Sequence, residues 1–92
     1  MGKFRVKIET LAETHIKAHY KSGNKPVIRK IEKILIELSE TPYTGEGSPE
    51  PLKYDLTGFW SRRINQKDRM IYKVDDNTVT VFVISAMGHY GK

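Results

Sequence analysis

The 92-residue chain has no cysteine and no long apolar run. The lack of cysteine excludes disulfide scaffolds, thiolate zinc sites and cysteine nucleophiles, so packing and hydrogen bonds must hold the fold together. The longest apolar runs, residues 34–36 and 81–84, are far shorter than the roughly 20 residues that a membrane span needs. The N-terminus also has no apolar segment typical of a signal peptide. We therefore expect a soluble, cytoplasmic chain with no membrane partner.

The composition supports one small core and an excess of positive charge. Hydrophobic residues make up 38% of the chain and charged residues 29%, which argues against disorder. At this length there is room for a single domain, residues 1–92, and not for a second core. Sixteen Lys and Arg against eleven Asp and Glu give a net charge of +5, which favours a polyanionic partner.

The apolar periodicity of the first half predicts a strand followed by two helices. Residues 4–8 alternate apolar and basic, as in a strand that buries one face. Thr10 with Glu13 matches a capping box and predicts the start of a helix that ends at residues 22–24. From Pro26 a longer pattern predicts a second, more strongly amphipathic helix. The apolar positions of the two helices are Ala12, Ile16 and Tyr20, and then Val27, Ile28, Ile31, Ile34, Leu35 and Leu38.

The second half of the chain predicts a sheet. Residues 44–51 are too rich in glycine and proline for regular structure. Three extended segments follow, at residues 52–64, 70–74 and 78–84, and short polar connectors between them favour an antiparallel meander. The expected fold class is α+β, with two N-terminal helices on one face of a small, mainly antiparallel sheet in the order β-α-α-β-β-β.

Two short motifs argue against familiar sites. His15 and His19 lie four residues apart on the first helix, a spacing that can place two imidazoles on one metal ion, but no glutamate stands where a zinc hydrolase needs its base. We interpret the pair as a solvated helix face and expect no metal site. Residues 45–47 form only part of a phosphate-binding loop, without the Lys-Ser/Thr that should follow, so we expect no nucleotide site.

Residues 53–73 contain six basic residues against two acids. Strand alternation places Phe59 and Arg63 on one face of the sheet and Trp60 and Arg62 on the other. At least one basic side chain should therefore lie on the face away from the helices. A basic and partly aromatic sheet face suits single-stranded RNA, because guanidinium groups bind phosphates and rings stack on bases. The alternative is that these arginines only keep an exposed face soluble, and charge alone does not decide between the two.

Glu50 stands between Pro49 and Pro51, which restrict the backbone on both sides and give the carboxylate a defined direction. An imidazole and a phenol, His89 and Tyr90, follow the last predicted strand. A carboxylate, a histidine and several arginines without metal ligands provide a base, an acid and cations for phosphoryl transfer within RNA. The alternative is a turn acid and a polar tail.

Specific motifs in residues 41–74 and the pair at residues 89–90 resemble the YoeB (Txe) toxins of the RelE/ParE superfamily. The resemblance is carried by Pro49-Glu50-Pro51-Leu52-Lys53, by Gly58-Phe59-Trp60-Ser61-Arg62-Arg63, and by the late His89-Tyr90. It implies a RelE-like fold and ribosome-dependent cleavage of mRNA in the A site of the 70S ribosome, without metal or organic cofactor. It also implies a homodimer and neutralisation by a cognate YefM-like antitoxin.

The same resemblance assigns four catalytic roles. Glu50 matches the general base, and Arg69 matches the cation that stabilises the transition state. His89 matches the general acid, and Tyr90 matches the aromatic residue that positions the RNA. Attack by the 2′-oxygen would leave a 2′,3′-cyclic phosphate and a free 5′-hydroxyl.

Four further residues are expected to bind RNA. Lys53 and Arg63 match basic residues around the scissile phosphate in the family, and the basic, aromatic strand adds Arg62 and Trp60. Two alternatives remain: a toxin of the same fold that poisons gyrase, as ParE toxins do, and an RNA-binding or ribosome-binding module without catalysis. An antitoxin or repressor ranks last, because no segment resembles a helix-turn-helix recognition helix.

Overall fold

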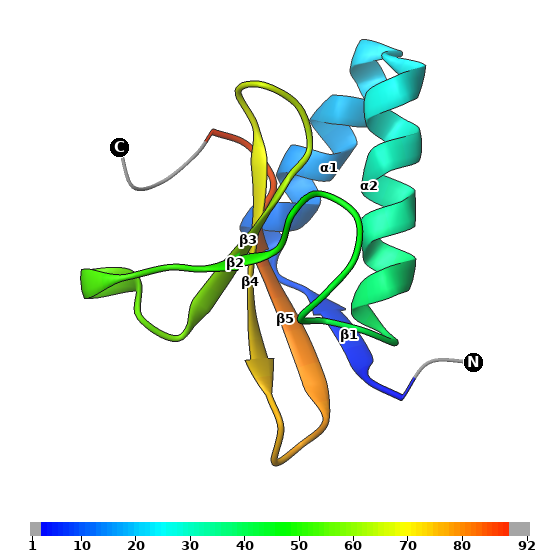
Figure 1. Ribbon diagram of the computed structural model, residues 1–92. Coiled ribbons are helices and arrows are strands. Elements are labelled where there is room, and N and C mark those ends of the chain that lie inside the picture. Colours follow the sequence, from blue (N-terminus) through cyan, green and yellow to red (C-terminus); the bar gives the residue numbers. More distant parts are fainter. Residues whose placement is uncertain (1–2, 89–92) are drawn as a thin grey trace.

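A computed structural model describes residues 3–88 of the chain, so His89 and Tyr90 lie outside the described residues. Two helices cover one face of a five-stranded sheet, which confirms the expected α+β class (Figure 1). No helix of the described residues is long and apolar enough to cross a membrane. The elements are β1 (Arg5–Ile8), α1 (Thr10–Ser22), α2 (Lys25–Leu38), β2 (Glu50–Pro51), the 3-10 turn η1 (Tyr54–Leu56), β3 (Phe59–Arg63), β4 (Arg69–Asp75) and β5 (Thr80–Ser85).

The strands lie in the order β1-β5-β4-β3-β2. β3, β4 and β5 form the expected antiparallel meander, and β2, at residues predicted to be irregular, adds a short antiparallel strand beside β3. β1 joins the opposite edge by pairing in parallel with β5, with Arg5 opposite Thr80. The sheet is therefore mixed, and the last strand of the chain lies between the first strand and β4.

Two local predictions are wrong. Thr10 is not the N-cap of α1, because Glu9 occupies that position without a side-chain hydrogen bond. Residues 52–56 do not form a strand: β2 ends at Pro51, and the chain then turns through η1, where Tyr54 has a φ of 58°. The Leu52 N–H still donates to Phe59 O at 2.8 Å, just beyond Pro51, before the chain leaves the sheet edge.

The core lies between the helices and the sheet. Asn24 caps α2 by accepting a hydrogen bond from the Val27 N–H at 3.3 Å, and Gly23 ends α1 in the left-handed conformation with a φ of 73°. The stronger apolar stripe of α2 is buried as its spacing predicts, and α1 contributes less. The buried apolar residues of the cluster are Ala12, Val27, Ile31, Ile34, Leu38, Ile64, Met70, Tyr72, Val81, Val83 and Ala86.

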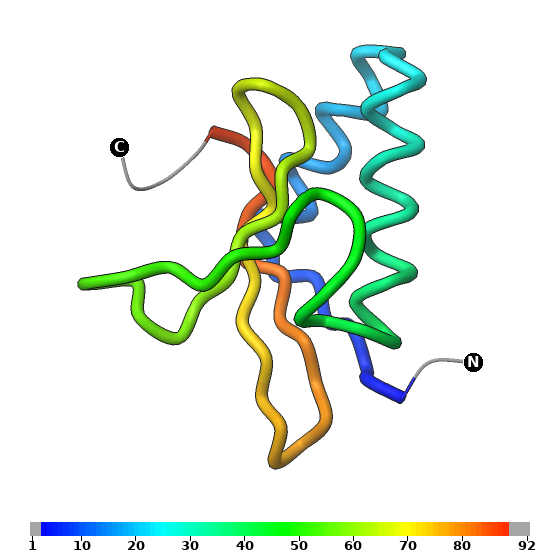
Figure 2. The backbone as a smooth tube through the Cα atoms, viewed as in Figure 1, coloured from blue at the N-terminus to red at the C-terminus, as the bar shows by residue number. Residues whose placement is uncertain are grey.

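The segment between α2 and β2 curves back along α2 before it reaches the sheet edge (Figure 2). It is fixed there by the guanidinium group of Arg62 in β3, which is completely buried. A guanidinium group has five N–H donors, and each of them has an acceptor. Those acceptors are Tyr72 Oη at 3.1 Å, Glu37 Oε1 at 2.9 Å, Glu46 O at 3.3 Å, Thr41 O at 2.7 Å and Thr44 O at 2.8 Å.

Replacing Arg62 by lysine is expected to destabilise the fold by about 3 kcal/mol or more, because an ammonium group cannot satisfy this planar set of acceptors and the ion pair with Glu37 is broken in a buried setting. Urea denaturation followed by Trp60 fluorescence measures the change. The matched control is Arg63→Lys on the next, exposed position of the same strand, which should cost less than about 0.5 kcal/mol. Equal losses of stability in the two variants would contradict the structural role of the buried Arg62 guanidinium group.

Candidate active site

The face of the sheet that points away from the helices begins with the alternation of β3. Arg62 is buried towards α2 together with the half-buried Trp60, so Phe59, Ser61 and Arg63 are directed to the opposite side. We term this opposite side the outer face. The predicted division of the strand is confirmed, because Arg62 is buried and Arg63 is exposed.

The strand register adds Glu50 and Arg69 to the outer face. Glu50 is paired with Ser61 across β2 and β3, and Arg63 is paired with Arg69 across β3 and β4. Paired residues of antiparallel strands share a face, and diagonal neighbours lie about 7–8 Å apart. Long side chains span that distance. The carboxylate and the two guanidinium groups are therefore able to reach one small group held over the sheet.

Arg63 and Arg69 form a pair that does not favour folding. Like charges directly opposite each other destabilise an antiparallel pair. Within residues 3–88 neither guanidinium group has an acidic partner, and the Glu50 carboxylate is exposed without a hydrogen bond or ion pair. Such local conflicts occur where a site requires them. Two neighbouring guanidinium groups without internal partners are suited to holding an external phosphate.

Two of the predicted RNA-binding residues lie on the helix-facing side instead. Arg62 is completely buried and all its donors are used within the chain, so the prediction that it binds RNA is wrong. Trp60 packs against the core, and its ring centroid lies 5.1 Å from that of Tyr43. The sheet therefore separates Trp60 from Glu50. Periodicity predicted that the residues alternate but not which face the helices would cover.

Two residues that were not selected from the sequence share the outer face. Lys73 is paired with Phe59 across β3 and β4, and its Nζ lies 5.8 Å from the centroid of the Phe59 ring. Alternation along β4 from Arg69 would have identified Lys73, because residues 69, 71 and 73 share one side. The outer face thus has an aromatic residue and a third cation close to the arginine pair.

Of the remaining predicted residues, one is described and two are not. Lys53 is exposed in the connection between β2 and β3, three residues after Glu50. His89 and Tyr90 lie outside the described residues, so their predicted roles stay predictions.

The described chain ends at Gly88, beside the start of β4. The N–H of Arg69 donates to Gly88 O at 2.8 Å, and the N–H of Gly88 donates to Asp68 Oδ1 at 2.9 Å. Asn65 donates to the other oxygen of Asp68 at 3.1 Å. Burial raises the pKa of Asp68, but the hydrogen bonds from Gly88 and Asn65 and nearby positive charges outweigh it, so the pKa lies below its ordinary value. Asp68 is thus an ionised anchor for Gly88.

The prediction of a solvated helix face for His15 and His19 is wrong. His19 is only 6% exposed, and both imidazoles bind the backbone of Ala86. Within residues 3–88 no group of three or more His, Asp or Glu side chains is arranged to hold a metal ion.

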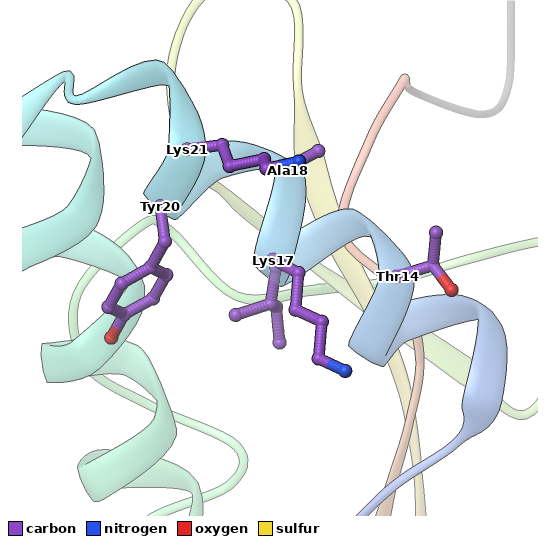
Figure 3. Close-up of a pocket in the computed structure, with 6 residues that line it drawn as sticks. Thr14, Lys17, Ala18, Tyr20 and Lys21 are labelled. Atoms are coloured by element: carbon purple, nitrogen blue, oxygen red, sulfur yellow. The ribbon is translucent and has the colours of Figure 1, made fainter.

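The structure also has a groove whose described lining residues include none of the predicted catalytic residues. This open groove lies along α1 and is lined by side chains of that helix (Figure 3). Tyr20 borders it and donates a hydrogen bond to Glu32 of α2 at 2.7 Å. Its described lining residues are Thr14, Ile16, Lys17, Ala18, Tyr20 and Lys21, which include no acid.

Comparison with known proteins identifies the family of this chain. A family model described as "YoeB-like toxin of bacterial type II toxin-antitoxin system" matches residues 13–90. The protein named Toxin YoeB from Escherichia coli O6:H1 is 40% identical over 63 residues, which cover 68% of this chain and 75% of that protein.

Two solved structures are similar over nearly the whole chain. The YoeB dimer from Staphylococcus aureus has 31% sequence identity and a TM-score of 0.79, and the match covers 96% of this chain and 99% of that one. The YoeB-YefM complex from the same organism has 34% identity and a TM-score of 0.76, with coverage of 95% and 98%. The fold, the outer face and these similarities define a toxin of a type II toxin–antitoxin system. Within that class, the chain belongs to the YoeB-like toxin family.

Removing one of the two facing arginines is expected to preserve or increase stability. Arg63→Gln relieves the like-charge pair, so the free energy of unfolding at low salt should rise by about 0.2–1 kcal/mol. Lys53→Gln, which removes an exposed charge outside the strand ladder, is the control and should change it by less than about 0.5 kcal/mol. Urea denaturation measures both. A clear loss of stability in Arg63→Gln would mean that the pair has a structural role.

The lowered pKa of Asp68 predicts a specific acid sensitivity. A carboxyl group whose pKa is lower in the folded chain stabilises the fold above its ordinary pKa of 3.8, and this contribution disappears as the pH falls through the folded value. The stability difference between wild type and Asp68→Ala should therefore be largest at neutral pH and shrink below about pH 4. Asp55→Ala, at an exposed acid, provides the reference. A difference that does not vary with pH would contradict the assignment.

Proposed function

We propose that this toxin is a metal-independent endoribonuclease that cleaves mRNA in the A site of the ribosome and so inhibits translation. The observation that carries the proposal is the unpaired Glu50 carboxylate beside the facing pair of Arg63 and Arg69 on the outer face. A base and two cations without internal partners form most of the group that RNA cleavage requires. Membership of the YoeB-like family is consistent with this activity.

The proposed reaction is an internal phosphoryl transfer. Glu50 accepts the proton of the ribose 2′-hydroxyl, and the 2′-oxygen forms a bond to the adjacent phosphorus. The bond from phosphorus to the 5′-oxygen of the next nucleotide breaks, and His89 donates a proton to that leaving oxygen. Arg69 and Arg63 stabilise the charge on the pentacoordinate phosphorus. The products are a 2′,3′-cyclic phosphate and a free 5′-hydroxyl.

Further side chains of the outer face are proposed to hold the RNA on both sides of the scissile phosphate. Lys53 and Lys73 neutralise neighbouring phosphates. Phe59 offers a ring for stacking on a base, a role in which it replaces the inward-lying Trp60. Tyr90 is proposed to position the base at the reacting ribose.

Dependence on the ribosome follows from the weakness of this chemistry. A carboxylate is a weak base towards a hydroxyl group, and general acid–base steps supply only about 10²–10⁴-fold each. Alignment of the 2′-oxygen with the phosphorus is worth more than either of these steps. We propose that the ribosome supplies that alignment by presenting the mRNA in the A site, and hence that the toxin acts in the cytoplasm.

Two protein partners are part of the proposal. A YefM-like antitoxin is proposed to cover the outer face with an acidic segment, because an acidic chain complements the unpaired cations there. A second copy of the chain is proposed to form a homodimer. Structures of a YoeB dimer and of a YoeB-YefM complex among the relatives support both partners.

The test is primer extension on a defined mRNA in 70S ribosomes. Glu50→Gln keeps the size of the side chain but removes the base, so we expect cleavage to fall by about 10²–10⁴-fold. Binding of the toxin to ribosomes, measured by co-sedimentation, should change little. Glu13→Gln, at an exposed acid of α1, is the matched control and should cleave like wild type.

An A-site cut that requires both the ribosome and Glu50 would support the proposal. Equal losses of cleavage and of ribosome binding in Glu50→Gln would contradict the catalytic role. The absence of any cut by wild type would overturn the nuclease function and favour a ParE-like gyrase poison, for which gyrase-dependent DNA breaks are the readout.

A further inference from the structure

We propose that His15, His19 and Asp68 form a polar clamp that fixes the position of the last described residues beside the start of β4. The clamp grips the backbone at Ala86 and Gly88, and the sequence continues directly with His89 and Tyr90. The three residues would therefore act in cleavage as positioning residues, through the general acid, without touching the RNA. The inference rests on the proposed function for its catalytic meaning, but the clamp itself is a set of described contacts.

The first part of the clamp completes hydrogen bonds that the sheet leaves open. The last pair between β1 and β5 joins Ile8 to Val83, and the chain then turns away into α1. Ala86 is completely buried beyond that point, where β1 offers no backbone partner. A buried N–H or C=O without a partner is costly. Two side chains of α1, His15 and His19, take the place of the missing strand.

The two imidazoles have complementary roles. The N–H of Ala86 donates to Nδ1 of His15 at 3.0 Å, so this nitrogen must be unprotonated. Nε2 of His19 lies 2.9 Å from the Ala86 carbonyl oxygen, which only accepts, so that nitrogen must carry a hydrogen. The spacing of four residues places both rings on one side of the helix. One residue of the terminal segment is therefore held through both of its backbone polar groups.

The second part of the clamp lies two residues further along the chain. Gly88 donates to the Asp68 carboxylate and accepts from the N–H of Arg69, which is one of the two facing arginines of the outer face. His19 and Asp68 also line one small cavity together with Met87. The contacts at residues 86 and 88 thus come from both sides of the terminal segment, from α1 and from the start of β4. These contacts fix the backbone of the last described residues, directly before His89 in the sequence.

A backbone grip of this kind needs hydrogen-bonding atoms at defined positions, not histidine as such. The amide oxygen of asparagine can occupy the place of Nδ1, and the amide nitrogen of glutamine can occupy the place of Nε2. Leucine fills similar space without either function. These substitutions separate the hydrogen bond from the packing at each position.

The experiment compares His15→Leu with His15→Asn, and His19→Leu with His19→Gln. Lys17→Leu is the control for an apolar substitution on the same helix, since the Lys17 side chain is 76% exposed. Amide hydrogen exchange of Ala86 and Gly88 reports on the clamp without reference to activity. Single-turnover cleavage of ribosome-bound mRNA at saturating toxin reports on positioning, with ribosome co-sedimentation and the unfolding midpoint measured beside it.

We expect the leucine variants to exchange the Ala86 amide at least about tenfold faster and to cleave at least about tenfold more slowly, with ribosome binding retained. The asparagine and glutamine variants should recover both properties to within about threefold of wild type. Packing of the histidine ring alone would not produce this recovery, because the recovery requires the hydrogen bond. Leucine variants that cleave like wild type, or polar variants no better than leucine, would overturn the inference. If wild type itself does not cleave while the exchange pattern is as expected, the proposed nuclease function fails and the clamp stands.

Discussion

The guanidinium group of Arg62 determines where the segment before β2 can lie, and with it the position of Glu50. Three of its five acceptors are backbone oxygens at residues 41, 44 and 46, one is the Glu37 carboxylate at the end of α2, and one is Tyr72 in β4. The Arg63 N–H adds a bond to Gly47 O at 2.7 Å. The approach is so close that a Cβ on Gly47 would lie 2.8 Å from the Arg63 carbonyl oxygen. The chain therefore enters the sheet edge from a fixed direction.

The same buried arginine also decides what the outer face presents. Because side chains alternate, an inward Arg62 requires an outward Arg63, and the register then places Glu50 and Arg69 on the same side. A shift by one residue would exchange the buried cation for the exposed one. Two consecutive arginines thus have opposite roles. Arg62 is satisfied entirely within the fold, whereas Arg63 has no acidic partner among residues 3–88 and faces another arginine.

Much of the fold could be predicted from the sequence because its elements have strong local patterns. The apolar stripe of α2, the break at Gly23 and the short polar connectors of the meander all correspond to the structure. The parallel pairing of β1 with β5 could not be predicted, since it joins residues more than seventy positions apart and has no local signal. The short β2 was missed because the glycines and prolines of residues 44–51 predict a loop, and the turn at Tyr54 was missed because residues 52–64 were predicted to be extended.

The candidate site was predicted in its chemistry more than in its geometry. Glu50, Arg63 and Arg69 were selected, and the structure brings them together on the outer face. Arg62 was wrongly predicted to bind RNA, because the sequence of a strand does not show whether hydrogen-bond acceptors in the core surround a basic residue. Lys73 could have been predicted to lie on the outer face, because it alternates with Arg69 along β4. The contacts of His15 and His19 with Ala86 could not be foreseen, because the acceptor and donor they meet belong to the backbone.

The place of β5 between β1 and β4 has a consequence for the synthesis of the chain. β5 is the last strand to emerge from the ribosome, yet both the N-terminal strand and the meander bond to it. The sheet cannot close around a nascent chain that still lacks residues 80–85, and the segment that reaches Asp68 and Arg69 comes later still. The complete outer face therefore forms only after synthesis has passed residues 80–88, so a nascent chain that stops short of β5 contains the residues of both helices and of β1 to β4 but not the finished sheet.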